Sequence, residues 1–160
     1  MQSGAEYQYK TMTVDEICRL NVREIADNNS VLFLWVTVPM MEEGFQVLRA
    51  WGYSFKTMLT WRKIMSLGMG YWFRGQTEHI LVGVRGRVKA FRCQEPNFLQ
   101  LKALRHSEKP EEFRQLIERA TKGLNPRVEL FARRRVDGWD TWGNEIASDV
   151  QLEVAATHGV

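Results

Sequence analysis

The order of apolar and polar positions along the chain predicts alternating strands and helices. The clearest strand is the apolar run NNSVLFLWVTV, residues 28–38, which follows turn-forming residues and is rich in β-branched and aromatic side chains. Such a run is typical of a strand buried on both faces, in a sheet covered by helices on each side. Further strands are expected at SFKTMLTWRK (54–63), EHILVGVRG (78–86) and VELF (128–131), with RVKAFRC (87–93) as a weak strand or hairpin arm.

Three segments between these runs have helical patterns. In TMTVDEICRL, Thr13 and Glu16 have the spacing of a capping box. A second helix is expected in PMMEEGFQVLRAWGY (39–53), and a third in KPEEFRQLIERATKG (109–123), with Pro110 in its first turn. Strands that alternate with helices indicate an α/β fold with a mostly parallel sheet. We expect one domain over residues 1–150, followed by a flexible tail at 151–160.

Composition narrows the class of protein without fixing it. Of the 160 residues, 44% are hydrophobic and 26% charged, which is ordinary for a globular protein. A net charge of +3 permits an anionic partner but does not require one. The two cysteines, Cys18 and Cys93, are far apart and have no nearby histidine cluster, so neither a metal site nor a disulfide scaffold is expected. With no signal-peptide core and no apolar run long enough for a membrane span, we expect an intracellular protein.

Unusual side chains gather where the predicted strands end. In an α/β sheet, ligands bind at the carboxyl ends of strands. Trp35, the run 61–63 (Trp-Arg-Lys) and the run 133–135 (three arginines) all stand at such ends. The arginines, followed by Trp139 and Trp142, fit either a planar anionic or polar-aromatic ligand or a solvated turn.

Four further residues are candidates for a site, and three of them have a second interpretation. Asn144 and Glu145 suit hydroxyl groups such as those of a ribose, although on local sequence alone a helix cap is the better explanation of Asn144. Glu78 fits either a sheet edge or a cleft wall, and Lys109 either neutralises an acid such as Glu78 or is solvated.

The segment IMSLGMGYWFRGQT (64–77) predicts a loop, because it combines three glycines with adjacent aromatic residues. We interpret it as an aromatic loop beside a cleft, with a plain surface loop as the alternative. The three histidines lack the context of a catalytic triad, and no Gly-x-Gly-x-x-Gly follows a strand. Hydrolase and nicotinamide-dependent chemistry are therefore disfavoured.

Six segments in order resemble a known family, the adenine-N6 methyltransferases related to the catalytic subunit of the eukaryotic messenger-RNA adenosine methyltransferase. They cover about residues 7–146 and read YKTMTVDEICRLNV, LFLWVTVPMMEEGFQVLRAWGY, TWRK, GMGYWFRGQTEHILVGVRG, HSEKPEEFRQLIER and VELFARRRVDGWDTWGNE. The resemblance implies a Rossmann-like methyltransferase sheet, circularly ordered so that the donor-site strand lies near the carboxyl terminus. It also implies S-adenosylmethionine as the methyl donor and adenine N6 in nucleic acid as the acceptor.

The resemblance assigns roles to three groups of residues. The donor is expected to contact Lys109, Arg133, Asn144 and Glu145. The target base is expected beside Tyr9, Trp35 and Glu78, and the nucleic-acid loop would present Tyr71, Trp72 and Arg74.

In one respect the sequence departs from the family. The family carries Asp-Pro-Pro-Trp, whose aspartate accepts a hydrogen bond from the adenine amine, and this tetrapeptide does not occur in the sequence. No catalytic residue is therefore identified; the chain is expected to be either a shortened version or one without the chemistry. Loss of the strand before the motif would leave an unpaired edge beside residues 31–38, so that the isolated chain is marginally stable or dependent on a partner.

These observations predict methyl transfer from S-adenosylmethionine to adenine N6, in DNA rather than RNA because the chain is compact. The alternative is a non-catalytic subunit whose basic segment, Arg85, Arg87, Lys89 and Arg92, contacts phosphates. A transferase acting on a small molecule is a third option, and assembly as a homo- or hetero-oligomer stays open.

Overall fold

A computed structural model describes residues 12–65, 68–105 and 108–157. Its contacts divide the chain into two compact units. The central unit is Asn28–Lys122, and the terminal unit combines Met1–Asp27 with Gly123–Val160. Within the described ranges, no helix has the length and apolar character needed to cross a membrane.

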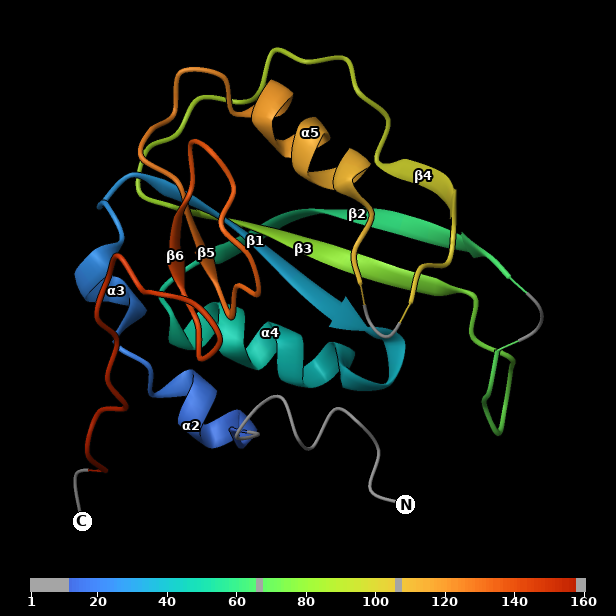
Figure 1. The fold of residues 1–160 in the computed structure, drawn as a ribbon, viewed down its shortest axis with the longest axis horizontal. Helices are drawn as coiled ribbons and strands as arrows, with labels where there is room; N and C mark the ends of the chain where they lie inside the picture. Colours follow the sequence, from blue (N-terminus) through green and yellow to red (C-terminus); the bar gives the residue numbers. More distant parts are fainter. Residues whose placement is uncertain (1–11, 66–67, 106–107, 158–160) are drawn as a thin grey trace. The chain divides into compact units, whose positions relative to one another are not determined.

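The central unit is built on a four-stranded sheet in the order β1-β3-β2-β4 (Figure 1). Its strands are β1 (Ser30–Thr37), β2 (Ser54–Ile64), β3 (Thr77–Arg85) and β4 (Phe98–Lys102). β3 lies between β1 and β2 and runs antiparallel to both, whereas β4 pairs with β2 in parallel. β1 and β2 therefore point the same way, with one strand of opposite direction between them.

This sheet is mixed, so the α/β class is confirmed but the predicted mostly parallel arrangement is not. The helix α4 (Met41–Ala50) connects β1 to β2 by the kind of crossover that strands of the same direction require. The two strands are not neighbours, however, because one strand position is left between them. β3 fills that position because the loop after β2 turns the chain straight back. A pattern of alternating strands and helices cannot reveal such an insertion.

β1 is the outer strand of this sheet, as expected for an edge without a neighbour beside residues 31–38. The expectation that both its faces are buried is wrong: residues 30–35 are half-buried, and Val36 alone in the strand is buried. An edge strand is covered on fewer sides than a central one, which accounts for the difference. The fully covered strand is β3, where Ile80, Leu81 and Val82 are at most 3% exposed.

One helix covers each face of the sheet, as the sequence predicted (Figure 1). α4 (Met41–Ala50) follows a single 3₁₀ turn, η1 (Val38–Met40), and a Cβ added to its Gly44 would overlap Val36 of β1. α5 (Glu111–Ala120) begins after Pro110 and buries Phe113, Leu116 and Ile117. The result is three layers, with the sheet between two amphipathic helices.

Two strand assignments in the second half of the central unit differ from expectation. Residues 87–93, expected as a weak strand, have no regular structure, and β4 lies further along the chain, at 98–102. β4 is short and pairs only with the carboxyl-terminal half of β2, from Thr60↔Phe98 to Ile64↔Lys102. β4 is a strand because of its pairing with β2, and no local residue pattern indicates it.

The terminal unit contains two short helices and a two-stranded parallel sheet. These elements are α2 (Val14–Cys18), α3 (Val22–Ile25), β5 (Val128–Leu130) and β6 (Asp140–Trp142). The predicted capping box is present, since Thr13 and Glu16 bond each other's backbone amides. Beyond Asp149, Val154 pairs with Leu20, and the Ala155 amide donates to the Arg19 carbonyl at 2.8 Å.

Candidate functional site

A buried carboxylate lies at the start of β3. Glu78 is 5% exposed and accepts hydrogen bonds from two lysines, one on each carboxylate oxygen. Lys109 Nζ is 2.6 Å from Oε1, and Lys63 Nζ contacts Oε2. Lys63 reaches this point from the end of β2, and Lys109 from the segment before α5. Of the two alternatives for Lys109, the structure thus supports neutralisation of Glu78.

The two lysines determine the charge of the group. Burial alone would raise the pKa of Glu78, but the hydrogen bonds from Lys109 and Lys63, together with their charges, outweigh it and lower that pKa. Glu78 is therefore ionised at neutral pH, and two ammonium groups share one carboxylate. Each ammonium carries three N–H donors and gives one to Glu78, so this positive cluster retains the capacity to bind an anion.

An aromatic cluster fixes the two lysines. The Trp35 and Trp61 rings both pack edge-on or tilted against Phe113, at 5.1 and 6.5 Å. Lys109 Nζ is 5.0 Å from the centre of the Trp35 ring, and Lys63 Nζ is 5.1 Å from that of Trp61. Each lysine therefore has both a carboxylate and an indole face as partners, which restricts its rotamers.

Sequence reasoning placed Trp61 and Lys63 at a strand end together with Trp35 but gave them no role, and it missed Phe113. A signal for the first two was present, because positions two apart on a strand point to the same face. Trp61 is the direct cross-strand partner of Glu78, so Lys63 two residues on lies on that same face, whereas Arg62 is exposed. The contribution of Phe113 depends on where α5 packs, which no local pattern specifies.

The second group of predicted residues lies in the terminal unit, where β5 and β6 end side by side. Leu130 pairs with Trp142, and the Ala132 amide donates to the Trp142 carbonyl at 3.0 Å. Gly143 packs so closely on the backbone that a Cβ there would overlap the Ala132 carbonyl oxygen. Arg133 directly follows Ala132, and the Asn144-Glu145 pair directly follows Gly143, so this contact brings the three predicted residues to one end of the two-stranded sheet.

All three of these side chains, Arg133, Asn144 and Glu145, are exposed. Phe131 makes the sharp turn after β5 with a φ of 58°, a left-handed conformation that is rare for residues other than glycine. Its ring packs edge-on against Trp142, with 5.2 Å between centres. A strained turn at the exit of a strand is a frequent feature of binding sites.

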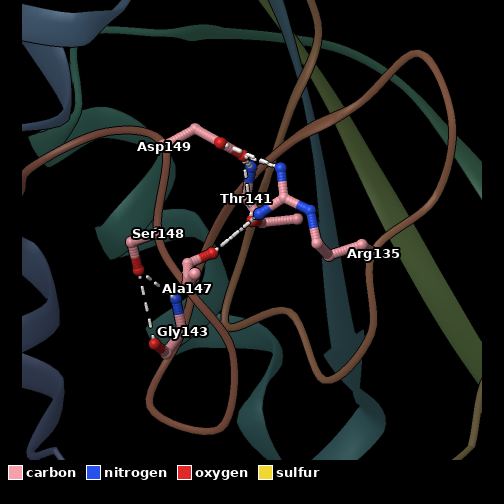
Figure 2. Close-up of polar contacts among 6 residues, drawn as sticks. All are labelled: Arg135, Thr141, Gly143, Ala147, Ser148 and Asp149. Carbon is pink, nitrogen blue, oxygen red and sulfur yellow. Dashed lines mark hydrogen bonds and ion pairs between the residues drawn. The ribbon is translucent and has the colours of Figure 1, made fainter.

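Arg135, the third of the three arginines, binds other residues of the protein through its side chain. Figure 2 shows its guanidinium bonded to both carboxylate oxygens of Asp149, at 2.9 and 3.0 Å, and to the Ala147 carbonyl at 3.0 Å. Asp149 also accepts from the amide and hydroxyl of Thr141, which is fully buried. We call these residues the Arg135 clamp. The clamp holds the loop that contains Asn144 and Glu145 against β6.

The remaining predicted residues lie on the surface or outside the described ranges. Tyr71, Trp72 and Arg74 are exposed on the loop between β2 and β3. Tyr9 lies outside the described residues. His79 bonds two hydroxyls through its ring nitrogens, those of Thr60 at 3.0 Å and Thr77 at 3.1 Å. Among the residues that the structure describes, no group of three or more His, Cys, Asp or Glu is arranged to hold a metal ion.

A known protein family matches most of the chain. The family model MT-A70 matches residues 1–145. The chain belongs to the MT-A70 family. The resemblance inferred from the six segments is thereby confirmed.

The relatives that the chain matches are named as methyltransferases, and several of them as N(6)-adenosine-methyltransferases. It is 33% identical over 155 residues to the type II methyltransferase M.MunI of Mycoplasma sp., covering 95% of this chain and 65% of that protein. It is 34% identical over 151 residues to the human N(6)-adenosine-methyltransferase catalytic subunit METTL3, covering 88% of this chain and 26% of that protein. A putative N(6)-adenosine-methyltransferase of Medicago truncatula is similarly related, at 34% over 151 residues. The chain therefore spans about two thirds of M.MunI and about a quarter of the longer relatives.

Proposed function

We propose that this chain provides the donor-binding and base-facing parts of an S-adenosylmethionine-dependent adenine-N6 methyltransferase that acts on nucleic acid, with DNA as the favoured substrate. The observation that carries the proposal is the family match over residues 1–145, which includes both groups of site residues. The geometry supports it, because Trp35, Glu78 and Lys109 come together from segments distant in sequence, and the β5–β6 contact brings Arg133, Asn144 and Glu145 to one end of the two-stranded sheet.

In this proposal the donor contacts come from four residues. Arg133, Asn144 and Glu145 present a cation, an amide and a carboxylate at one end of the β5–β6 sheet. These are the groups that bind the hydroxyls and ring edge of a nucleoside. Lys109 supplies a positive charge for the carboxylate of the donor, and its donors not used by Glu78 suit that role.

The contacts favour a positioning role for Glu78. Both of its oxygens are occupied by lysines and the residue is 5% exposed, so its effect on a ligand would pass through Lys109. Trp35 lies on the other side of the same lysine and holds its ammonium group over the indole face. Tyr9, proposed beside the target base, lies outside the described residues.

Methyl transfer to adenine N6 requires the amine to lie in line with the donor methyl group, and it needs no covalent intermediate. Positioning and electrostatic stabilisation supply the catalysis. The residue that accepts the adenine amine hydrogen bond is not assigned, because Asp-Pro-Pro-Trp does not occur in the sequence. Binding of the donor and turnover are therefore tested separately.

Donor binding is measured by calorimetry with S-adenosylhomocysteine. We expect the wild type to bind, and Lys109→Met and Asn144→Ala each to weaken binding about ten-fold or more, whereas the exposed control Lys122→Met has no effect. Transfer of labelled methyl groups is then followed with duplex DNA, single-stranded DNA and RNA. Absence of binding heat with the wild-type chain would refute the donor site.

A second function, a non-catalytic subunit of a methyltransferase complex, is favoured by one observation, the basic segment after β3. Its residues Arg87, Lys89 and Arg92 are exposed and would contact nucleic acid. Nucleic-acid binding that survives both Lys109→Ala and Asn144→Ala, in a chain that gives no heat with S-adenosylhomocysteine, would favour this alternative.

A further inference from the structure

An apolar cavity lies between α5 and the sheet, within the central unit. Its volume is about 200 Å³. On the sheet side it is lined by a row of neighbouring side chains, because Val82 of β3 pairs with both Phe33 of β1 and Thr57 of β2. The residues of α5 that line it are Leu116, Ile117 and Ala120. The cavity is therefore bounded by two layers of the fold.

The third wall of the cavity is the irregular segment before β4. We call residues 91–97 the strap. The Phe91 ring stacks on Phe33 of β1, with 6.3 Å between centres and 14° between planes. Glu95 forms an ion pair with Arg119 of α5 at 2.7 Å, and Figure 1 shows the segment running along that helix. The strap is thus attached to both the sheet and α5, and the cavity is part of the folded unit.

The space stays unfilled because several of the side chains around it are short. Thr57, Cys93 and Ala120 line the cavity from the sheet, the strap and α5, respectively. Protein interiors are otherwise close-packed, so a molecule that fills such a space gains contacts that the chain itself does not make. An apolar cavity of about 150 Å³ binds benzene, and this one therefore has room for one aromatic ring or two fused rings.

The charges around the cavity favour a neutral ligand. Among the described residues that line it, Glu95 alone carries a charge, and Arg119 neutralises it. A charged molecule would lose its hydration there without gaining a counter-charge. The nearly parallel rings of Phe33 and Phe91 suit a flat aromatic molecule, and the Thr57 hydroxyl can bond one polar group on it.

The same helix connects the cavity to Lys109. Phe113, in the first turn of α5, packs against Trp35 and Trp61, whose rings hold Lys109 and its partner lysine. Leu116 follows three residues later and lines the cavity, and residues three apart lie on the same face of a helix. A change in the packing of α5 over the cavity therefore reaches Lys109 as well.

We propose that this cavity binds a small, neutral aromatic molecule of one or two rings, and that the bound molecule alters binding of the methyl donor through α5. The first half is independent of the proposed function. The second half rests on it, because it presupposes that Lys109 contacts the donor. Since coupling between two binding sites is reciprocal, the donor and the aromatic molecule change each other's affinity by the same factor.

The probe is indole, and its binding to the full chain is followed by the NMR shifts of the Val82, Leu116 and Ile117 methyl groups. We expect saturable shifts with a Kd of about 1 mM or lower. Ala120→Leu, which fills the cavity from α5, should weaken binding about ten-fold or more. The matched control is Ala50→Leu, because Ala50 is likewise the last residue of its helix, α4, but is exposed and outside the cavity.

Two further measurements do not depend on repacking of α5. Thr57→Val keeps the size of the side chain and removes its hydroxyl, so indole should bind about three-fold more weakly. In a Cys18→Ser background, saturating indole should slow alkylation of Cys93 by iodoacetamide about five-fold or more, because the thiol lines the occupied cavity. Cys18, measured in a Cys93→Ser background, should react at an unchanged rate.

Calorimetry with S-adenosylhomocysteine tests the coupling. Its affinity should change about three-fold or more when indole is saturating, and indole should have no such effect in Ala120→Leu. Indole shifts that do not saturate, or that are equal in the wild type and a folded Ala120→Leu, would refute the site. If indole binds in the cavity and leaves the affinity for S-adenosylhomocysteine unchanged, the link through α5 is refuted. If the wild type binds indole but gives no heat with S-adenosylhomocysteine, the proposed function and the link both fail, whereas the cavity site is supported.

Discussion

Replacing Glu78 with glutamine should destabilise the central unit and show that the carboxylate is the centre of its charged cluster. The substitution keeps the size of the side chain and removes its charge. It leaves Lys63 and Lys109, whose side chains are 26% and 33% exposed, without their shared counter-charge. The two lysines would then repel each other beneath the aromatic cluster.

The magnitude follows from the contacts that are lost. A hydrogen bond to a charged group contributes about 1.5–3 kcal/mol, and Glu78 accepts two of them. Because both lysines are partly exposed, water replaces some of this interaction, and we expect a loss of about 2–4 kcal/mol in the free energy of unfolding. For a chain of this length, that corresponds to a melting temperature lower by roughly 5–12 °C.

The pH dependence gives an independent signature. Since the folded chain lowers the pKa of Glu78, its contribution to stability is complete above the ordinary carboxyl value of 4.5 and is lost as the pH falls through the lower, folded value. The glutamine variant should therefore lose less stability than the wild type on acidification below pH 4.5.

Urea and thermal unfolding at pH 7 and at acid pH measure both effects, with the exposed Glu108→Gln as the matched control. Adding Lys63→Met to the Glu78→Gln variant should restore part of the stability, because one uncompensated charge is removed. This account of the cluster would be refuted if Glu78→Gln had a melting temperature within about 2 °C of the wild type at pH 7 and lost as much stability as the wild type on acidification.

Two further predictions concern the terminal unit. Gly143→Ala should weaken S-adenosylhomocysteine binding at least ten-fold in calorimetry, because the added Cβ would overlap a backbone oxygen and push Asn144 away from the end of β5. Wild-type affinity in this variant would contradict the close packing. Asp149→Asn should accelerate hydrogen exchange at the Thr141 amide, which Asp149 binds at 2.9 Å, while Asp137→Asn should not. The hydrogen bond from Arg135 lowers the pKa of Asp149, so in the wild type this protection should persist at the ordinary value of 3.8 and disappear only as the pH falls through the lower, folded value. Protection independent of pH would exclude the carboxylate.

Sequence reasoning found the elements whose signals are local. The capping box at Thr13 and Glu16 and the two amphipathic helices α4 and α5 are defined by spacing within a few residues, and all are present. In these cases the pattern itself contains the physical cause. The pairing of Lys109 with Glu78, by contrast, was one of two alternatives for that lysine, and the fold decided between them.

What the sequence did not reveal depends on partners distant in the chain. β4 and β6 are strands of five and three residues whose hydrogen bonds exist only once β2 and β5 are in place. Likewise, the sequence gives no reason to distinguish Arg135 from the two arginines before it, because its partner Asp149 is placed beside it only by the fold. The direction of β3 is a similar case, because residue pattern reports burial but not strand polarity.

The antiparallel strand at the centre of the sheet has a consequence for the order of assembly. During synthesis β1, α4 and β2 emerge before β3, yet β1 and β2 share no hydrogen bonds and await the strand that separates them. Ser30 meets its partner Arg85 only after the whole intervening stretch has left the ribosome. Closure of the sheet is thus a late, long-range step, and such steps make folding slow and leave strands open to mispairing until the last one arrives.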